Sequence, residues 1–418
     1  GSPLELPAPP PLPATDRDGN ALPKAIIGSR DRFPLLKAPI YLNHAAVSPL
    51  SVGAVAAMDG WARDLATHGV DAFGRWMAQR ERLRARLAAM FGVNAEDLAL
   101  TAGTTRGVLD VAWCLDWKAG DRVILFEGEF PANVTPWQQA AKHFDLRPEF
   151  LSLDGFGDGS GAGLARLEAA LQGGARLVAV SAVQFQTGLR MPLAAMAELC
   201  HRHGAELFVD GIQACGMVPL DLAALGVDYL ACGGHKWLMG PEGCGFLYVS
   251  PQAIDHLKPR MAGWLSHDNG LGFLFEGEGH LRYDRPVRRA ASFLEPGASP
   301  SAGMAALEAS VTDIHNLDQQ AIFAHVQAWH DAVEPGLLDL GFRSLRGSDP
   351  GARSGSLCLK PPADVDVVKL LAPLAAEGVS CAIPDGCLRL APHWPNALSE
   401  APRVLAAAAA ALATVRRP

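Results

Sequence analysis

Lys236 stands beside His235 in the segment 229–249, YLACGGHKWLMGPEGCGFLYV, between two apolar runs that each predict a buried strand. A buried lysine is unusual, because removing water from its ammonium group costs free energy and lowers its pKa. Such a lysine is expected either to pair with an acid or to serve as an amine nucleophile.

An acid occupies a similar place earlier in the chain. Asp210 ends the apolar run AELFVDG, and Gln213 follows three residues later. A carboxylate at the end of a buried strand needs a cation or a strong hydrogen-bond donor. Two interpretations follow: a structural ion pair between Asp210 and Lys236, or a ligand that both side chains contact.

The loops after the other predicted strands also carry polar or aromatic residues. Thr104 and Thr105 precede a helix that is expected from Arg106, where hydroxyls and free backbone N–H groups suit a phosphate, although a simple N-cap has the same residues. Phe130 either lies flat on a planar ring or fills the core. Gln184, in the loop VQFQTG, offers an amide.

Pyridoxal 5′-phosphate satisfies the whole set. Its phosphate suits the start of the helix, its ring suits Phe130, and Asp210 would keep its pyridine nitrogen protonated. Lys236 would hold its aldehyde as a Schiff base. The ion-pair interpretation explains neither the glycines nor the phosphate loop. The sequence therefore predicts this cofactor, and no metal site.

Strands and helices alternate between about residues 97 and 250, which predicts an α/β fold with a parallel sheet covered on both faces. Ligands of such sheets collect at the carboxyl ends of the strands. Residues 1–40 are expected to form an extended, proline-rich arm and residues 41–300 a large cofactor-binding domain. Residues 301–418, with a contribution from the N-terminal segment, are expected to form a smaller α+β domain.

The composition limits which binding partners and which cellular location are expected. The 418 residues carry a net charge of −8, with 49% hydrophobic and 19% charged residues, which is typical of a globular protein and gives no reason to expect nucleic acid or an anionic membrane. The longest apolar run, 404–415, is shorter than the roughly 18 residues that cross a bilayer. Eight cysteines without a C-x-x-C pair favour reduced thiols and a cytoplasmic location.

The chain resembles the class V aminotransferase family of fold-type I pyridoxal-phosphate enzymes, which includes cysteine desulfurases, isopenicillin-N epimerases and kynureninases. The resemblance runs from Tyr41 to about Asn396. It is carried by VDGIQACGMVPLDLAALGVDYLACGGHKWLMGPEGCGFLYV, with support from AGTTRGV, EFPANVTPW and YLNHAAVSPL. It implies a large domain with a mostly parallel seven-stranded sheet between helices, a smaller α+β domain, and a homodimer with shared active sites.

The resemblance also implies a role for each site residue. Lys236 would carry the cofactor and Asp210 would pair with the pyridine nitrogen. The phosphate would be held by Thr104, Thr105 and His235, with Ser299 from the neighbouring subunit. The ring would lie on Phe130, and its phenolic oxygen would be reached by Gln213. Gln184 would donate a hydrogen bond from its amide. Arg389 would hold the substrate carboxylate, with a surface arginine as the alternative interpretation, and Asn43 and His44 would also face the substrate.

Two departures from the family bear on the reaction. Phe130 stands where desulfurases use a histidine, and Cys381 and Cys387 do not match the longer loop that holds their nucleophilic cysteine. We expect an amino-acid substrate to form an external aldimine, from which Lys236 removes the Cα proton. A lyase (β-elimination, C–S or C–C cleavage) or an epimerase is expected; an aminotransferase, a cysteine desulfurase or a non-catalytic binding protein are the alternatives.

Overall fold

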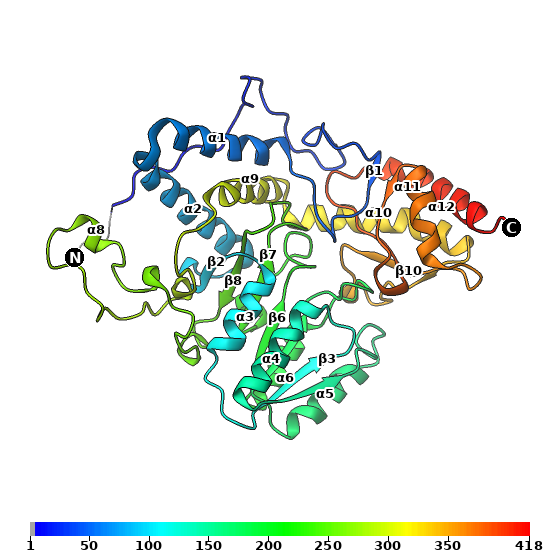
Figure 1. The fold of residues 1–418 in the computed structure, drawn as a ribbon. Helices are drawn as coiled ribbons and strands as arrows, with labels where there is room; N and C mark the ends of the chain where they lie inside the picture. Colours follow the sequence, from blue (N-terminus) through cyan, green and yellow to red (C-terminus); the bar gives the residue numbers. More distant parts are fainter. Residues whose placement is uncertain (1–4) are drawn as a thin grey trace.

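A seven-stranded sheet forms the centre of the computed structural model, which describes residues 5–418 (Figure 1). The strand order is β2-β8-β7-β6-β5-β3-β4. The strands are β2 (Leu98–Thr101), β3 (Arg122–Phe126), β4 (Arg147–Leu151), β5 (Leu177–Ser181), β6 (Glu206–Asp210), β7 (Tyr229–Gly233) and β8 (Gly245–Val249). Only β8 runs antiparallel to its neighbours, β2 and β7. The predicted mostly parallel seven-stranded sheet is confirmed.

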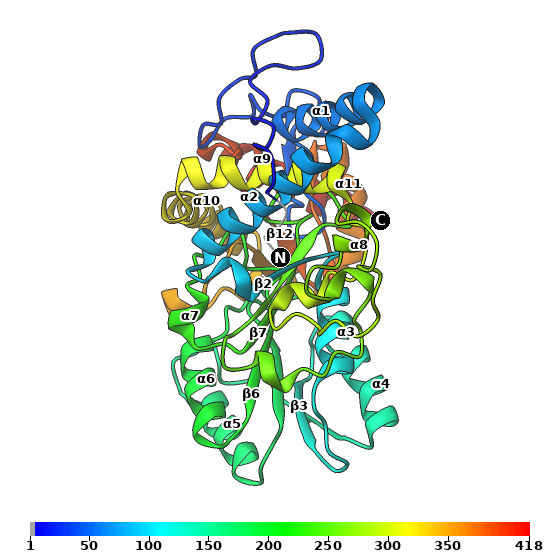
Figure 2. The ribbon, with the colours of Figure 1, turned by 90° about the vertical axis from the view of Figure 1, so that its left-hand side faces the viewer.

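Helices cover both faces of this sheet because side chains along each strand alternate between two cores. Leu177 and Ala179 of β5 join the cluster under α3 (Thr104–Cys114) and α4 (Thr135–Phe144). Val178 and Val180 join the cluster on the other face. The helices of that second face are α2 (Phe73–Phe91), α5 (Ala162–Gln172), α6 (Leu193–Arg202) and α9 (Ser301–Leu317). Figure 2 shows the sheet between these layers.

The helix α9 differs from the expectation that residues from 301 onward belong to the small domain. Met304, Leu307 and Val311 join the same core as β8 and α2. The helix also packs against α1 (Val52–His68) and α2. By its packing, α9 therefore groups with the large sheet.

The C-terminal part contains three antiparallel strands in the order β12-β10-β9: β9 (Arg343–Ser344), β10 (Leu357–Lys360) and β12 (Leu388–Leu390). The N-terminal strand β1 (Ile40–Tyr41) pairs in parallel with β11 (Val379–Ser380). The helices here are α10 (Gln319–Asp339), α11 (Leu371–Ala376) and α12 (Ala401–Val415). A separate apolar cluster joins these elements, so this part has its own core.

Among the described residues, one helical segment, Leu398–Val415, is long and apolar enough to cross a membrane by length and hydropathy. It is longer than expected because a 3₁₀ turn (Leu398–Glu400) precedes α12. Its inner side, including Val404, Ala408 and Leu412, is buried in the small core. This packing is that of a core helix.

All eight cysteines are free and buried, as the sequence predicts for reduced thiols. The cytoplasmic location stays a prediction.

Candidate active site

Lys236, Phe130 and Arg389 come together at the carboxyl edge of the large sheet. Lys236 follows β7 and Phe130 follows β3, and the Lys236 Nζ atom lies 5.4 Å from the centre of the Phe130 ring. Phe130 meets Phe185, from the loop after β5, edge-on at 5.3 Å between ring centres. Arg389, on β12, donates a hydrogen bond to the Phe185 carbonyl (3.0 Å). Three separate chain segments, those of Phe130, Phe185 and Arg389, thus meet beside the segment that carries the lysine.

The amine of Lys236 lies in a setting that favours its neutral form. Burial is the main cause of its lowered pKa, and the charge of Arg389 adds to it, while Asp210 acts in the opposite direction. Within the described residues, no salt bridge joins Lys236 to Asp210. The structural ion pair that the sequence left open is therefore absent from this part of the chain.

Asp210 ends β6 with one oxygen bonded and one left over. The carboxylate is 2% exposed, and its Oδ1 accepts a hydrogen bond from the Ile212 N–H (3.1 Å). Its Oδ2 is buried without a partner in the described chain. Burial raises the pKa of this carboxyl to about 6. A free, buried carboxylate oxygen is suited to accept a hydrogen bond from a cationic ring N–H.

Other buried polar atoms near this edge also lack partners among the described residues. They are both amide atoms of Gln184, the Nε of Arg389 and the Oδ1 of Asn43. Buried polar groups are nearly always hydrogen-bonded, so their shared lack of partners indicates a polar ligand. A pyridine ring with its own N–H and a carboxylate-bearing substrate would supply the missing donors and acceptors. The residues present therefore fit pyridoxal phosphate.

The predicted phosphate loop lies at the start of α3. Thr104 is buried, and its hydroxyl accepts a hydrogen bond from the Gly233 N–H (2.8 Å), while Thr105 is exposed in the first turn. Gly103 has a φ of 152°, and a Cβ there would lie 3.8 Å from the Gly233 Cα. The loop therefore sits directly against the end of β7, three residues before Lys236.

Gln213 and His44 contact the polypeptide around the lysine. The Gln213 amide donates to the Ala45 carbonyl (3.0 Å) and its carbonyl accepts from the Trp237 indole (2.9 Å), which leaves one amide hydrogen for a ligand. His44 is buried with a pKa held well below its ordinary value by burial and by His393. Its ring bonds Ser48 (2.7 Å), whose hydroxyl donates to the Lys236 carbonyl.

Four of the predicted residues, Arg389, His235, Asn43 and Ser299, occupy distinct surroundings. Arg389 is 6% exposed, so the surface-arginine interpretation does not hold. His235 is half-buried, and burial and the Lys236 charge lower its pKa. Asn43 donates to the Cys381 carbonyl (3.3 Å). Ser299 lies two residues before α9, and the described chain shows no hydrogen bond from its side chain to the other predicted residues.

Sequence reasoning missed Glu129 as a site residue. Its Oε1 accepts hydrogen bonds from the Ser181 N–H and from the Asn133 amide (3.1 Å), and its Oε2 has no partner in the described chain. Burial, with a contribution from the negative charge of Asp210, raises the pKa of the Glu129 carboxyl to about 7. Its position directly before Phe130 was the available signal.

Comparison with known proteins identifies the family of the chain. The family model for aminotransferase class V matches residues 40–387. An uncharacterised aminotransferase of Bacillus subtilis, YcbU, is 26% identical over 377 residues, covering 89% of this chain and 94% of the relative. A probable cysteine desulfurase of Chlamydia trachomatis is 30% identical over 296 residues, covering 70% of this chain and 69% of the relative.

Among solved structures, the cystine C–S lyase C-DES, in complex with its reaction product cysteine persulfide, superimposes with a TM-score of 0.81. It is 26% identical, and the match covers 88% of this chain and 97% of the lyase. The predicted fold, that of the fold-type I pyridoxal-phosphate enzymes, is confirmed. The match over residues 40–387 means that the chain belongs to the class V aminotransferase family.

Proposed function

We propose that this chain is a lyase that releases a β-substituent from an amino acid, with a sulfur-containing substrate such as cystine as the first candidate. The cofactor is pyridoxal 5′-phosphate, as in the family to which the chain belongs. The observation that carries the proposal is the convergence of Lys236, Asp210 and Arg389 in a setting without an accessible thiol. The likeness to a cystine C–S lyase supports it.

The chain's own residues would hold the cofactor at defined atoms. Asp210 would accept a hydrogen bond at its free Oδ2, and Phe130 would cover one face of the ring. Thr104, Thr105 and the N–H groups at the start of α3 would surround the phosphate, with His235 close by. Bound there, pyridoxal phosphate supplies an electron-withdrawing ring that weakens a bond at the substrate Cα.

Lys236 would act as the general base. Its lowered pKa keeps a share of the amine neutral, so that Nζ accepts the Cα proton and later delivers a proton. Arg389 would grip the substrate carboxylate with its free Nε–H, because a guanidinium binds a carboxylate through parallel N–H groups. Asn43 and Gln184 offer further polar atoms to the substrate or the cofactor.

The desulfurase alternative requires a cysteine that reaches the substrate as a thiolate. Cys381 is buried, and burial raises the pKa of its thiol to about 12. Cys387 is also fully buried. A thiolate nucleophile needs a lowered pKa and access to solvent, so neither residue is suited to accept sulfur. These two cysteines favour elimination over sulfur transfer to the protein.

We also propose a homodimer with shared active sites, in which Ser299 faces the neighbouring subunit's phosphate. The segment 264–283, which precedes Ser299 in the chain, exposes large apolar side chains, including Trp264 (49%), Phe275 (61%) and Tyr283 (90%). Such a concentration of apolar surface is typical of an interface. Sedimentation should give twice the mass of one chain, and a monomer at micromolar concentration would contradict this part.

The function is tested by product analysis with the cofactor-loaded protein. With L-cystine or S-substituted L-cysteines, we expect pyruvate, ammonia and the released sulfur compound. Alanine with protein-bound persulfide would instead indicate a desulfurase, and the D-enantiomer without pyruvate an epimerase. The residue assignment is tested separately: after borohydride reduction, mass spectrometry should find the cofactor mass on the peptide that holds Lys236. In Lys236→Ala this mass should be absent and turnover should fall by about 10³-fold or more, whereas Lys369→Ala should change neither.

A further inference from the structure

A cavity lies where the segments that follow β5 and β6 meet the C-terminal part at Gly351. It encloses about 340 Å³ and is lined mainly by apolar side chains from the segments that follow β5 and β6. The apolar lining includes Val183, Leu193, Val218 and Leu220. Within the described chain, this lining includes none of the residues predicted for the active site.

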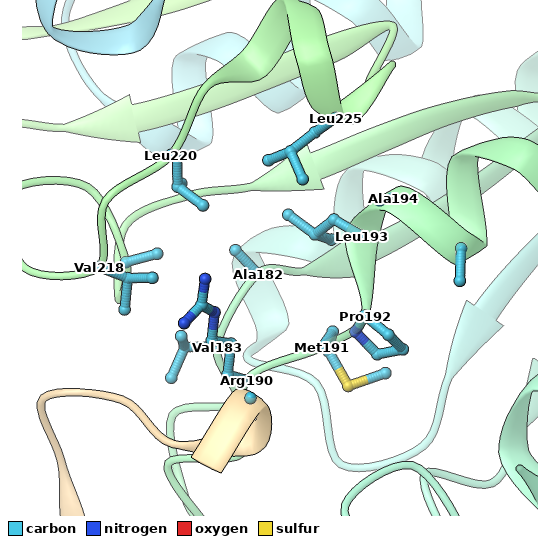
Figure 3. A pocket seen from close by; sticks show the side chains of 13 residues that line it. Ala182, Val183, Arg190, Met191, Pro192, Leu193, Ala194, Val218, Leu220 and Leu225 are labelled. Carbon is cyan, nitrogen blue, oxygen red and sulfur yellow. The ribbon is translucent and has the colours of Figure 1, made fainter. Parts of the chain in front are cut away.

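Arg190 is the one charged side chain in this lining as described. Figure 3 shows its guanidinium between Val218 and Ala182, pointing into the space that Leu220 and Leu193 border. The side chain is half-buried, and burial without any compensating charge lowers the pKa of the guanidinium. No hydrogen bond or ion pair of this side chain occurs among the described residues. The guanidinium carbon instead lies 5.9 Å from the centre of the Phe323 ring.

A cation–π contact occupies the flat face of a guanidinium and leaves the N–H donors at its edge free. Those donors border an apolar space and have no protein partner within the described chain. A ligand that brings one negative charge would therefore gain a charge-assisted hydrogen bond here.

The start of α6 adds a second feature that suits an anion. Its N-cap is Pro192, which makes no side-chain cap, and its first turn (Leu193–Ala195) lines the cavity. The N–H groups of Ala194 and Ala195 have no backbone hydrogen-bond partner within the described chain. Backbone N–H groups at the start of a helix favour negative charge.

The position of Arg190 in the cavity wall is fixed, because backbone hydrogen bonds hold this residue from two sides. Val183 and Arg190 form an antiparallel bridge, and the Gln184 N–H bonds the Leu189 carbonyl (2.9 Å). The Arg190 N–H in turn bonds the carbonyl of Ala352, in the C-terminal part (2.9 Å). The charged group is therefore presented by a short, fixed loop at the junction of the two parts of the molecule.

We infer that this cavity binds a monocarboxylate with an apolar tail, such as a medium-chain fatty acid. One guanidinium balances one carboxylate, while the remaining walls (Val183, Leu193, Val218 and Leu220) match a hydrocarbon chain. A phosphate dianion would leave excess charge in an apolar cavity. The inference does not depend on the reaction that the chain catalyses, since it concerns residues outside the proposed catalytic set.

The test is a calorimetric titration of the cofactor-loaded protein with octanoate, with octanol as the uncharged probe of equal length. We expect one octanoate per chain and clearly weaker binding of octanol. Arg190→Met keeps an unbranched stem and removes the charge, so it should weaken octanoate binding by about tenfold or more. Arg403→Met, at an exposed position on α12, is the matched control and should leave binding unchanged.

A second variant keeps the charge and changes the space. Ala194 is exposed at the rim of the cavity, so Ala194→Phe should fold normally and still weaken binding by obstructing entry. Equal binding of octanol and octanoate, or full affinity in Arg190→Met, would overturn the inference. So would a loss of octanoate binding in Arg389→Lys but not in Arg190→Met, because the probe would then occupy the active site.

Discussion

The carboxyl edge of the large sheet and the contact between α2 and α9 each bury a carboxylate, and the two are treated in opposite ways. Glu308 on α9 is fully buried, yet both of its oxygens are bonded: Arg82 donates to both, and Gln79 and Arg86 donate to one each. Asp210 is buried as deeply and keeps one oxygen without a partner in the described chain. The hydrogen bonds of Glu308 join α2 to α9. The unbonded oxygen of Asp210 leaves an acceptor that a ligand could use.

The comparison separates burial from function. A buried carboxylate whose oxygens are all bonded can be accommodated in the fold. A buried carboxylate with an unbonded oxygen raises the free energy of the cofactor-free folded protein. Asp210, Gln184 and Arg389 all retain unbonded buried atoms within the described chain. Single unbonded atoms also occur elsewhere in the described chain, for example at Gln79 and Asp110, so it is the convergence of several at one sheet edge that points to a ligand.

The sharpest test of this difference is Asp210→Asn. Activity should fall by roughly 10²–10³-fold, because an amide cannot stabilise a protonated ring nitrogen as a carboxylate does. The free energy of unfolding of the cofactor-free protein should stay the same or rise, since a buried charge without a partner is removed. Steady-state kinetics and urea denaturation measure the two quantities. A large loss of stability with intact activity would reverse the assignment.

Glu308→Gln should show the opposite pattern. We expect a loss of roughly 2–3 kcal/mol in the free energy of unfolding, less than the 3–5 kcal/mol typical of fully buried pairs, because Arg82 and Arg86 reach water. Turnover at saturating cofactor should change little. Asp255→Asn, which breaks an exposed pair with Arg289, is the matched control and should leave the free energy of unfolding almost unchanged.

Two buried carboxyls should make the stability of the protein depend on pH. The pKa of Glu129 is raised to about 7, and that of Asp210 to about 6. A carboxyl with a folded-state pKa above its unfolded value binds more protons when folded. The free energy of unfolding should therefore fall as pH rises from about 4 to 7. Each such group contributes at most about 1.4 kcal/mol per pH unit.

Glu129→Gln should remove its share of this slope in the cofactor-free protein, as measured by urea denaturation at a series of pH values. Adding the cofactor should reduce the remaining slope, because a cationic ring nitrogen beside Asp210 restores the balance of charge. An unchanged slope in Glu129→Gln would mean that this carboxyl ionises normally.

The sequence predicted those parts of the molecule in which local pattern decides the outcome. Apolar runs predicted the strands around Asp210 and Lys236 (β6, β7 and β8), and the residues that follow strands predicted the edge where Lys236 and Phe130 meet. The strand β4 (RPEFL) was missed because Arg147 and Glu149 interrupt its apolar pattern at the end of the sheet, where one side faces solvent. Its place depends on pairing with β3, which no local pattern encodes.

Side-chain partners were less predictable than strand ends. The sequence left Asp210 and Lys236 as a possible ion pair, and only the three-dimensional arrangement removes that interpretation. Glu129 was passed over because nothing in its neighbours shows that Ser181, from another strand, would bond it. The packing of α9 on the large sheet likewise depends on contacts with α1 and α2, more than 200 residues earlier in the chain.

The smallest expected effect is that of Cys381→Ala, at a residue that a desulfurase would require and a lyase would not. Because the thiol is buried with a pKa raised to about 12, its removal should leave the rate of pyruvate formation within about twofold. The small cavity that remains should lower the free energy of unfolding by only about 1 kcal/mol. Cys387→Ala serves as the matched variant on the neighbouring strand end. Turnover that disappears in Cys381→Ala while the fold persists would place sulfur chemistry on this thiol, and the elimination mechanism would have to be abandoned.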